Sequence, residues 1–437
     1  MATTEASRRL VDYELRPATE VGERFLELCE AHAADFAERA AQHDKEGSFP
    51  FENFDAMRES GVLAATVPPE LGGLGVESLV DLTAGIDRLA RADGSTAIAV
   101  TMHLGVGWSL SMALRRAVTE SDEVLQSTGV AASAEALRAM IEPALAGIGD
   151  GSFVVAGAGT EIGTHMLYPR TEATRVEDGW RVNGHKTFVT LAPIATVFAT
   201  SCRFQDEDGR WRPGGGWIAR DDPGVEIQDN WDPLGMRASG SPDVVFTDAF
   251  IPEGMFTTGG ELGEATPLWI VRTSGSAVPL VGACLGMAEA AREYIVGVVT
   301  TRRKAPSNTR LADRYPIQHT IAEIEIDLAA CRAMVERTCR IWDHYLEHAS
   351  LTEFEGSDAL ELMKDLQCTK TFVNRKAVEI VDRAMTASGG AGYLAKNVIS
   401  RLYRDVRACS FMQPFSPNEA FEYIGKVTLG LDPIVDM

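Results

Sequence analysis

The spacing of apolar residues changes twice along the chain. Up to about residue 150, apolar side chains recur at helical intervals, as at Phe25, Cys29 and Phe36. This spacing predicts amphipathic helices. A second helical pattern covers residues 79–92, and Asp93-Gly94 after it is typical of a helix end.

Between about residues 151 and 258 the pattern becomes strand-like. Short apolar or β-branched runs occur at 153–155, 180–182, 187–190, 197–200 and 244–246. Turn signals lie between them, at Asp178-Gly179, Asn183-Gly184, Asp208-Gly209 and a glycine run at 214–216. The pair Asn183-Gly184, flanked by two of these runs, predicts a hairpin turn. Short strands joined by such turns predict an antiparallel sheet or barrel.

The last third returns to helical spacing. Helices are predicted at 276–302, 317–348, 357–388 and from about Pro417 onward, and Gly389-Gly390 is a good stop for the third. Successive long amphipathic helices predict a four-helix bundle. Gly282 and Gly286, in the first of them, are spaced for close helix packing.

These patterns together predict an α+β fold in three parts. We expect an N-terminal all-α domain at residues 1–150, a central β domain at 151–268 and a C-terminal four-helix bundle at 269–437.

Charge and composition restrict the partners and the location. The 437 residues include 41 basic and 63 acidic side chains, a net charge of −22, which argues against a nucleic-acid or anionic-membrane surface. The longest nearly unbroken apolar run, 277–288, is shorter than the roughly 18 to 20 residues that a membrane span needs. Residues 1–10 lack the apolar segment of a secretory signal, so we expect a cytoplasmic protein.

Cysteine and histidine give no metal or disulfide signal. Seven cysteines, an odd number without a CxxC pair, predict reduced thiols used as small core residues. His344 and His348 have the i, i+4 spacing of metal ligands, but no third ligand is near in sequence, so no metal site is predicted. Dinucleotide-binding, P-loop and nucleophile-elbow motifs are also missing.

Five local motifs, in a fixed order, carry a family resemblance. They are Thr160-Glu161-Ile162-Gly163, the segment 182–190, the segment 234–246, Gly389-Gly390-Ala391-Gly392-Tyr393 and Arg401-Leu402-Tyr403-Arg404-Asp405. This set resembles the acyl-CoA dehydrogenase superfamily over roughly residues 20 to 430. The resemblance implies a flavin held between the β domain and the C-terminal bundle, in a homotetramer.

The resemblance also implies roles for residues near the flavin ring. Thr160, with Gly163 in the same loop, is similar to the residue that bonds the pyrimidine edge. Phe188, Val189 and Thr190 are similar to the strand that lies against the isoalloxazine, with Thr190 near N5, where a donor stabilises reduced flavin. Without the resemblance, these residues describe only a strand with alternating exposure.

A second group is implied for the far end of the cofactor. Arg302 falls where the family places an arginine for the flavin pyrophosphate, which suits a guanidinium. Gln318, Gly389, Gly390 and Gly392 are similar to segments that reach the ADP half of a neighbouring subunit's flavin. Without the resemblance, Arg302 is equally consistent with a solvated helix end, and Gly389 to Gly392 with a helix stop. The residues do not decide whether the flavin is FAD or FMN.

The chain departs from the dehydrogenases at the catalytic base. The glutamate position after the Arg404-Asp405 motif falls at Gln413, or at Pro414 or Phe415 if shifted, and the alternative position falls at about Ser276. None of these is an acid, although removal of an α-proton requires a base. Glu419 is the nearest candidate, and it also fits the first turn of a helix that starts at Ser416-Pro417.

Two further departures favour the flavin-dependent monooxygenase branch, and within it the amino-sugar N-oxygenases, or nitrososynthases. The Thr160 loop is about two residues shorter than in typical dehydrogenases, and the segment from Arg302 to Gln318 is about five residues longer. That branch uses reduced flavin and oxygen in a dry pocket and needs no α-proton base. Phe411, Met412, Gln413 and Phe415 would suit the pocket wall, or would be ordinary contacts of the last loop.

Three functional hypotheses follow. The first is a two-component monooxygenase of antibiotic biosynthesis that N-oxidises an amine and receives reduced FAD or FMN from a separate flavin reductase. The second is an acyl-CoA dehydrogenase or oxidase whose base comes from an unrecognised place, such as Glu419. The third is a non-catalytic scaffold with a flavin-enzyme fold.

Overall fold

The N-terminal part of the protein is helical, as the periodicity predicts. The structure, a computed structural model, describes residues 13–127, 133–264, 266–348 and 356–433, so the N-terminal segment 1–10 lies outside the described residues. Its first helices are α1 (Glu20–Glu46), α2 (Phe51–Glu59), α3 (Leu79–Ala92), α4 (Gly94–Thr119), α5 (Asp122–Ser127) and α6 (Ala134–Gly149), with short 3₁₀ turns at Val62–Ala64 and Pro69–Leu71. Asp93 is both the C-cap of α3 and the N-cap of α4. Its carboxylate caps α4 by accepting the Ser95 N–H at 3.0 Å.

The central part is one sheet with most strands antiparallel. Its strands are β1 (Val155–Ala158), β2 (Glu172–Val176), β3 (Gly179–Lys186), β4 (Val197–Gln205), β5 (Trp211–Ala219), β6 (Val225–Ile227), β7 (Val244–Pro252) and β8 (Phe256–Thr258). Their order is β6-β7-β3-β2-β4-β5-β8, and β1 pairs with β4. The β1–β4 pairing and a single residue pair between β2 and β4 are parallel, which the expectation of an antiparallel sheet did not include.

Two predicted turns lie inside strands instead. Asn183-Gly184 belongs to β3, whose hairpin with β2 turns at Asp178-Gly179. A Cβ at Gly184 would lie 2.2 Å from Thr171 Oγ1, so close packing accounts for this glycine. The glycines at 214–216 lie in β5, where Cβ atoms would meet Phe256, the Thr200 carbonyl and the Met255 carbonyl at 2.6–2.7 Å. Glycine marks close approach at both places rather than a turn.

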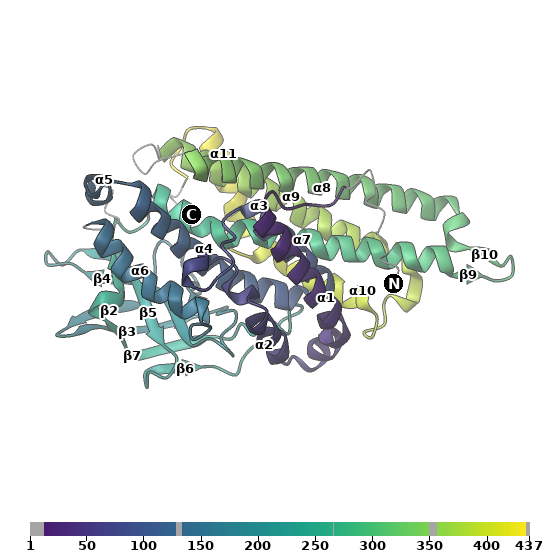
Figure 1. Cartoon of the computed structure of the whole chain (residues 1–437). Helices are drawn as coiled ribbons and strands as arrows, with labels where there is room; N and C mark the ends of the chain where they lie inside the picture. The colour runs from purple at the N-terminus through teal and green to yellow at the C-terminus, as the bar shows by residue number, and fades with distance from the viewer. Residues whose placement is uncertain (1–12, 128–132, 265, 349–355, 434–437) are drawn as a thin grey trace, which may run out of the picture.

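The C-terminal part is a bundle of long helices. It contains α7 (Pro267–Thr301), α8 (Tyr315–His348), α9 (Gly356–Ser388), α10 (Val398–Ala408) and α11 (Pro417–Thr428), with a small hairpin of β9 (Arg303–Lys304) and β10 (Thr309–Arg310). Short 3₁₀ turns occur at Glu253–Met255, Leu311–Asp313, Gly389–Ala391 and Cys409–Phe411. The predicted bundle of four helices therefore contains a fifth, α10. Figure 1 shows α8 and α9 running side by side, with the hairpin projecting at the end farthest from the sheet.

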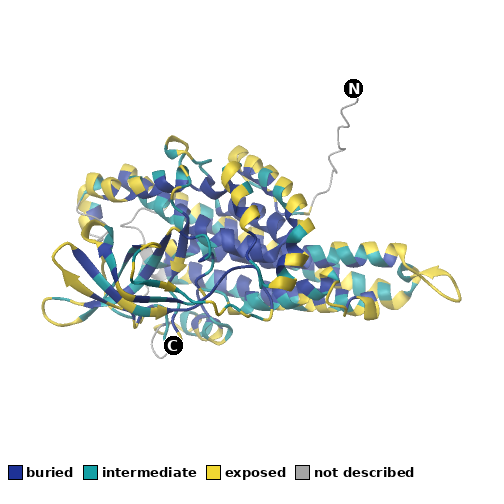
Figure 2. Ribbon diagram, turned by 90° about the horizontal axis from the view of Figure 1, so that it is seen from below, coloured by how far each residue is buried: buried dark blue, intermediate teal, exposed yellow. Residues whose placement is uncertain are grey.

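The core lies where α7 passes between the helical parts. Cβ atoms at Gly282 and Gly286 would lie 2.6 Å from Thr83 Cγ2 and 2.2 Å from the Asp87 carbonyl oxygen, which confirms close packing of α7 on α3. Figure 2 shows buried residues concentrated in the middle of the molecule. Two segments, Gly94–Thr119 and Trp269–Thr301, are long and apolar enough to cross a membrane by length and composition, and 67% and 83% of their apolar windows are buried in this fold.

One cysteine prediction is wrong. Cys284 in α7 and Cys409 after α10 form a disulfide across 125 positions of sequence. Cysteine count and local spacing could not predict it, because the pairing depends on contact between two distant helices. The other five cysteines are free, and all but Cys368 are buried.

Candidate active site

Two loops with unusual backbone conformations lie side by side at the ends of neighbouring strands, one after β3 and one before β7. Phe188 (φ 54°) and Leu191 (φ 75°) lie in the first, and Met236 (φ 54°) lies in the second. They are three of the five non-glycine residues with positive φ that the described parts of the chain contain. Such conformations cost about 1–3 kcal/mol each and cluster at functional sites. The segment 187–190 is therefore a loop, and its prediction as a strand is wrong.

The two loops are joined by hydrogen bonds. The Val189 N–H donates to the Pro242 carbonyl at 3.1 Å. Ser239 and Ser241 form a hydroxyl pair at 2.8 Å, and Ser241 donates to Thr190 Oγ1 at 2.9 Å. Sequence reasoning singled out Thr190 and missed both serines, although they stand in the 234–246 motif.

The Arg404-Asp405 motif holds the second loop in place. Asp405 Oδ1 accepts the Met236 N–H at 2.7 Å, and burial raises the pKa of the Asp405 carboxyl to about 6. Arg404 binds both carboxylate oxygens of Asp44 in α1, at 2.7 and 2.5 Å. The motif thus connects α10 to the loop and to the N-terminal helices, which fixes the strained backbone of Met236.

A buried ion pair fixes the Thr160 loop. Lys186 Nζ lies 2.5 Å from Glu161 Oε1 and donates to the Ser201 carbonyl at 2.6 Å. Glu161 also accepts the Arg170 and Thr171 N–H groups at 2.7 and 3.1 Å. Burial alone would raise the pKa of Glu161, but Lys186 and these amides lower it overall. The glutamate of the Thr160 motif is therefore a structural anchor.

The last loop reaches the Thr160 loop through Gln413. Gln413 Nε2 donates to Thr160 Oγ1 at 2.7 Å, while its Oε1 is buried with no partner in the described structure. Lys370 in α9 donates to the carbonyls of Met412 and Phe415, the latter at 2.6 Å. An amide, not a carboxylate, thus occupies the place where the family resemblance puts the base.

The aromatic residues of this loop divide into two groups. Phe415 is 1% exposed and stacks on His165 and Tyr423, with ring centroids 5.7 and 4.8 Å apart, so it is a core residue. Phe411 is 64% exposed and lies under the Arg407 guanidinium. Met412 is partly buried beside them.

The two other base candidates have different roles. Glu419 Oε2 accepts the Ser416 N–H at 2.6 Å, and the two residues form the capping box of α11, as the sequence predicts. Ser276 lies inside α7, and its hydroxyl bonds the Thr273 carbonyl at 3.3 Å.

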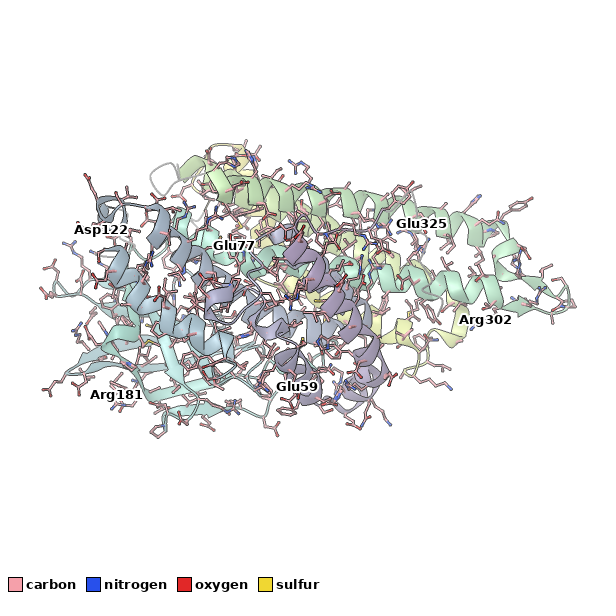
Figure 3. The ribbon with its side chains drawn as sticks, viewed as in Figure 1. Glu59, Glu77, Asp122, Arg181, Arg302 and Glu325 are labelled. Atoms are coloured by element: carbon pink, nitrogen blue, oxygen red, sulfur yellow. A yellow bond between two sulfur atoms is a disulfide. The ribbon has the colours of Figure 1, made fainter. Side chains whose placement is uncertain are left out.

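The second group of predicted flavin residues lies elsewhere. Arg302 Nη1 donates to the Ser388 carbonyl at 2.7 Å, beside Gly389 (φ 72°), Gly390 and Gly392, and Gln318 donates to the Ala312 carbonyl at 3.0 Å. Figure 3 shows Arg302 near the projecting hairpin, away from the sheet. One chain therefore does not bring this group to Thr160, Gly163 and Thr190.

The two histidines with metal-ligand spacing lie next to each other on α8. The rings of His344 and His348 lie 4.3 Å apart, and His348 Nδ1 contacts the His344 carbonyl at 2.8 Å. Within the described ranges, no group of three His, Cys, Asp or Glu residues could hold a metal ion.

The polar groups around Thr160 and Thr190 fit a flavin ring. The ring presents acceptors and one N–H donor along its pyrimidine edge, and the site offers hydroxyls from two loops and an amide oxygen without a partner. Buried polar atoms in native proteins rarely lack a partner, so the unpaired Oε1 of Gln413 fits a site where a ligand provides one.

Comparison with known proteins agrees with this geometry. Models of the acyl-CoA dehydrogenase N-terminal, middle and C-terminal domains match residues 19–119, 156–249 and 279–417. Amino sugar nitrososynthase DnmZ of Streptomyces peucetius is 33% identical, over 95% of each chain.

Two solved structures are similar over nearly the whole chain. One is KijD3 in complex with FMN and dTDP-3-amino-2,3,6-trideoxy-4-keto-3-methyl-D-glucose, with a TM-score of 0.85 and 32% identity over 98% of each chain. The other is the nitrososynthase from Micromonospora carbonacea var. africana, with a TM-score of 0.84 and 32% identity over 96% of this chain and 100% of that one. This chain therefore belongs to the acyl-CoA dehydrogenase family, and within it to the branch of flavin-dependent oxidoreductases that includes the amino sugar nitrososynthases.

Proposed function

We propose that this protein is a flavin-dependent monooxygenase that oxidises the amino group of a nucleotide-linked amino sugar. The observation that carries the proposal is Gln413, a neutral amide bonded to Thr160 where an acyl-CoA dehydrogenase needs a carboxylate. Glu419, the remaining acid, is occupied as a helix cap. The similar KijD3 structure contains FMN and a dTDP-linked amino sugar, which supports both the cofactor and the substrate class.

The residues of the site have separate tasks in this proposal. Thr160 would bind the pyrimidine edge of the flavin and Thr190 would lie near N5, with Gly163, Phe188 and Val189 in the loops around them. Phe411 and Met412 would form the apolar wall that excludes water from the substrate amine. Reduced flavin supplies the two electrons with which one oxygen atom of O₂ is transferred to the amine and the other leaves as water.

The reaction balances without an α-proton base. The amine, O₂, two electrons and two protons give a hydroxylamine and one water. A second round with the same reactants gives an N,N-dihydroxy amine and one water, and loss of a further water leaves the nitroso group. The test is an aerobic assay with a separate flavin reductase, FMN and a dTDP-linked 3-amino sugar, followed by mass spectrometry. A product heavier by one oxygen atom (the hydroxylamine), or by one oxygen atom less two hydrogen atoms (the nitroso sugar), supports the proposal, and unchanged substrate beside full flavin turnover contradicts it.

The dehydrogenase alternative is tested anaerobically. Oxidised enzyme should keep its flavin absorbance when it is mixed with saturated acyl-CoAs, because a neutral amide, Gln413, stands where the base is needed and such a base contributes about 10²–10⁴-fold in rate. Rapid stoichiometric bleaching would favour the dehydrogenase, with Glu419→Gln as the next variant.

We also propose a homotetramer that is supplied by a flavin reductase. In the far group, Arg302, Gln318, Gly389, Gly390 and Gly392 lie away from the Thr160 group of the same chain, so they could serve a flavin only across a subunit boundary. Exposed aromatic residues near that end, Tyr315 and Tyr393 at 78% and 83%, support an interface there. Light scattering that gives the mass of one chain with flavin bound would contradict it.

The division of the chain into domains at residues 1–150, 151–268 and 269–437 stays a prediction.

A further inference from the structure

Three hydroxyl groups form a directed chain that ends at Thr190. Ser239 is fully buried and Ser241 is 2% exposed. A hydroxyl has one proton to donate. Because Ser241 donates to Thr190 Oγ1, the proton between the two serines must come from Ser239. The direction is therefore Ser239 to Ser241 to Thr190, and the proton of Thr190 itself points away from Ser241.

No acceptor among the described residues receives the hydroxyl proton of Thr190. The buried hydroxyls of Thr101 and Ser111 differ in this respect, whereas those of Thr171 and Thr187 also lack a partner in the described structure. Thr101 donates to the Ala97 carbonyl of its own helix at 2.7 Å, and Ser111 donates to the Thr66 carbonyl at 2.7 Å. Thr190 is only partly buried, so a ligand in the site can reach it.

The backbone keeps Thr190 in this arrangement. Phe188 and Leu191, on both sides of it, have left-handed conformations, and so does Met236 at the start of the serine loop. Gly240, between the two serines, has φ 55°, and a Cβ there would lie 2.6 Å from Phe49. Strain of this kind persists only where surrounding contacts fix it. The strained backbone on both sides of Thr190 and at Met236 therefore helps to fix the positions of these three hydroxyls.

We propose that Ser241 is a positioning residue that makes Thr190 a hydrogen-bond donor to the bound flavin. The inference rests on the proposed function, because it needs a flavin in this site. Ser241 donates to one of the two lone pairs of Thr190 Oγ1, so the Thr190 O–H must point away from Ser241, toward the side where the flavin would bind. Hydrogen bonds in series polarise one another, which strengthens the last donor. A donor at the reacting edge stabilises negative charge on reduced flavin.

The test compares flavin binding in matched variants. Ser241→Ala and Thr190→Val should each weaken FMN binding by about 2- to 10-fold, the usual effect of one neutral hydrogen bond. Because both changes remove the same bond, the double variant should bind no more weakly than Thr190→Val. Both variants should also shift the visible absorption bands of bound FMN and lower its reduction potential. Titration of FMN fluorescence, absorption spectra and a dye-coupled reduction measure these effects.

Two further variants separate positioning from packing. Ser95→Ala changes a contact on another side of the serine loop, where Ser95 Oγ lies 4.0 Å from Met236 Sδ, and it should leave the spectrum and affinity unchanged. Ser241→Cys keeps the size of the side chain but donates weakly, so it should bind FMN like Ser241→Ala and melt like the unmodified protein.

The outcomes distinguish this inference from the proposed function. Unmodified protein that binds neither FMN nor FAD would contradict the proposed function itself. Normal FMN binding with an unchanged affinity and spectrum in Ser241→Ala would overturn only the role of Ser241. Additive losses in the double variant would also overturn it, because Ser241 would then act independently of Thr190.

Discussion

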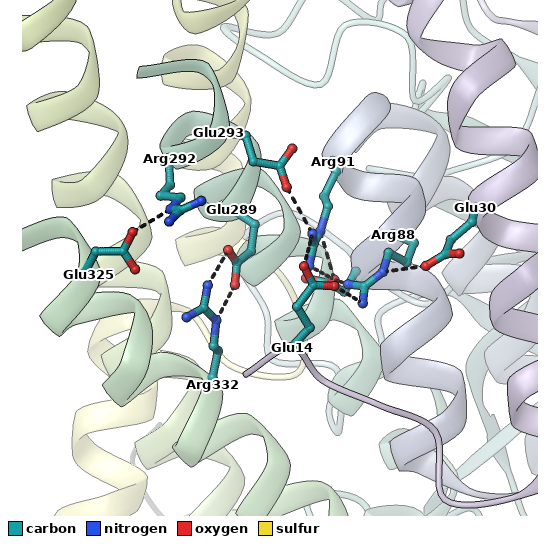
Figure 4. Close-up of polar contacts among 10 residues, drawn as sticks. Glu14, Glu30, Arg88, Arg91, Glu289, Arg292, Glu293, Glu325 and Arg332 are labelled. Atoms are coloured by element: carbon teal, nitrogen blue, oxygen red, sulfur yellow. Dashed lines mark hydrogen bonds and ion pairs between the residues drawn. The ribbon is translucent and has the colours of Figure 1, made fainter. Parts of the chain in front are cut away.

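Buried polar groups are paired differently at the interface of α3, α7 and α8, called here the helix interface, and at the candidate active site. At the interface, α3, α7 and α8 bring together a dense network of ion pairs (Figure 4). Arg332 binds Glu289 with two bonds, at 2.6 and 2.7 Å, and Arg91 binds Asp87 at 2.9 Å. Asp87 Oδ1 is the exception, since it has no partner while Oδ2 receives the arginines.

The active site contains few ion pairs, and isolated hydrogen bonds connect most of its polar side chains. Gln413 makes one hydrogen bond and leaves its Oε1 unpaired, and His165 Nε2 and Thr187 Oγ1 are buried without partners in the described structure. The interface is thus held mainly by ion pairs within one chain, whereas the unpaired atoms of the site lie around Gln413, where the proposed flavin would supply partners. Substitutions at the interface should therefore change stability, and substitutions at the site should change binding.

The largest effect is expected at the interface. Glu289→Ala leaves the Arg332 guanidinium without its partner, and loss of one member of a buried pair costs about 3–5 kcal/mol in the free energy of unfolding. Urea denaturation followed by circular dichroism measures it, with FMN affinity unchanged in the folded protein. The matched control is Glu325→Ala, which removes the partner of Arg292 where both side chains are more than a third exposed, and it should cost less than about 1 kcal/mol. Equal costs would remove the contrast between buried and exposed pairs.

The next effect concerns the far end of the flavin. Arg302→Ala should weaken FAD binding by about 1.5–3 kcal/mol, the range for a hydrogen bond to a charged group. FMN binding should change much less, because FMN has no pyrophosphate. Parallel titrations with both flavins measure the difference. Equal affinities of mutant and unmodified protein for FAD would remove Arg302 from the site.

A pH effect should mark the loop that carries Gln413. Burial lowers the pKa of Lys370 from its usual 10.5 to about 7, while Glu419 opposes the shift. Between these values the unfolded chain binds more protons than the folded one, so stability should rise with pH from about 7 to 10.5, by at most about 1.4 kcal/mol per unit. Lys370→Met should flatten this part of the curve. A slope that persists in this variant would assign the effect to another group.

The smallest effect is expected for the single bond across the site. Gln413→Ala should weaken FMN binding by about 1 kcal/mol, because Thr160 loses one neutral hydrogen bond. Its melting temperature should change little, in contrast to Glu289→Ala. A large loss of stability with normal FMN affinity would show that Gln413 belongs to the framework. Gln413→Glu additionally tests whether a restored carboxylate permits acyl-CoA dehydrogenation.

Periodicity and motifs were enough to predict the three-part fold, whereas the roles of the site residues stay predictions. The long helices were predictable because their apolar faces repeat at helical spacing, and the capping box at Ser416 and Glu419 depends on a local pattern. Thr160 and Gln413 were assigned from motif order. The strand predicted at 187–190, the turn at Asn183-Gly184 and the glycine run at 214–216 were wrong, because each depends on packing against a distant segment.

The sequence by itself thus determined the succession of a helical, a β-rich and a second helical part, the family and the absence of an acid at position 413. These features depend on neighbouring residues or on the identity of one residue. Only the tertiary structure decided that Gln413 meets Thr160, that Ser241 orients Thr190 and that Cys284 meets Cys409. Each of these contacts joins segments far apart in the chain, and its geometry is set by how the sheet and the helices pack rather than by local preference.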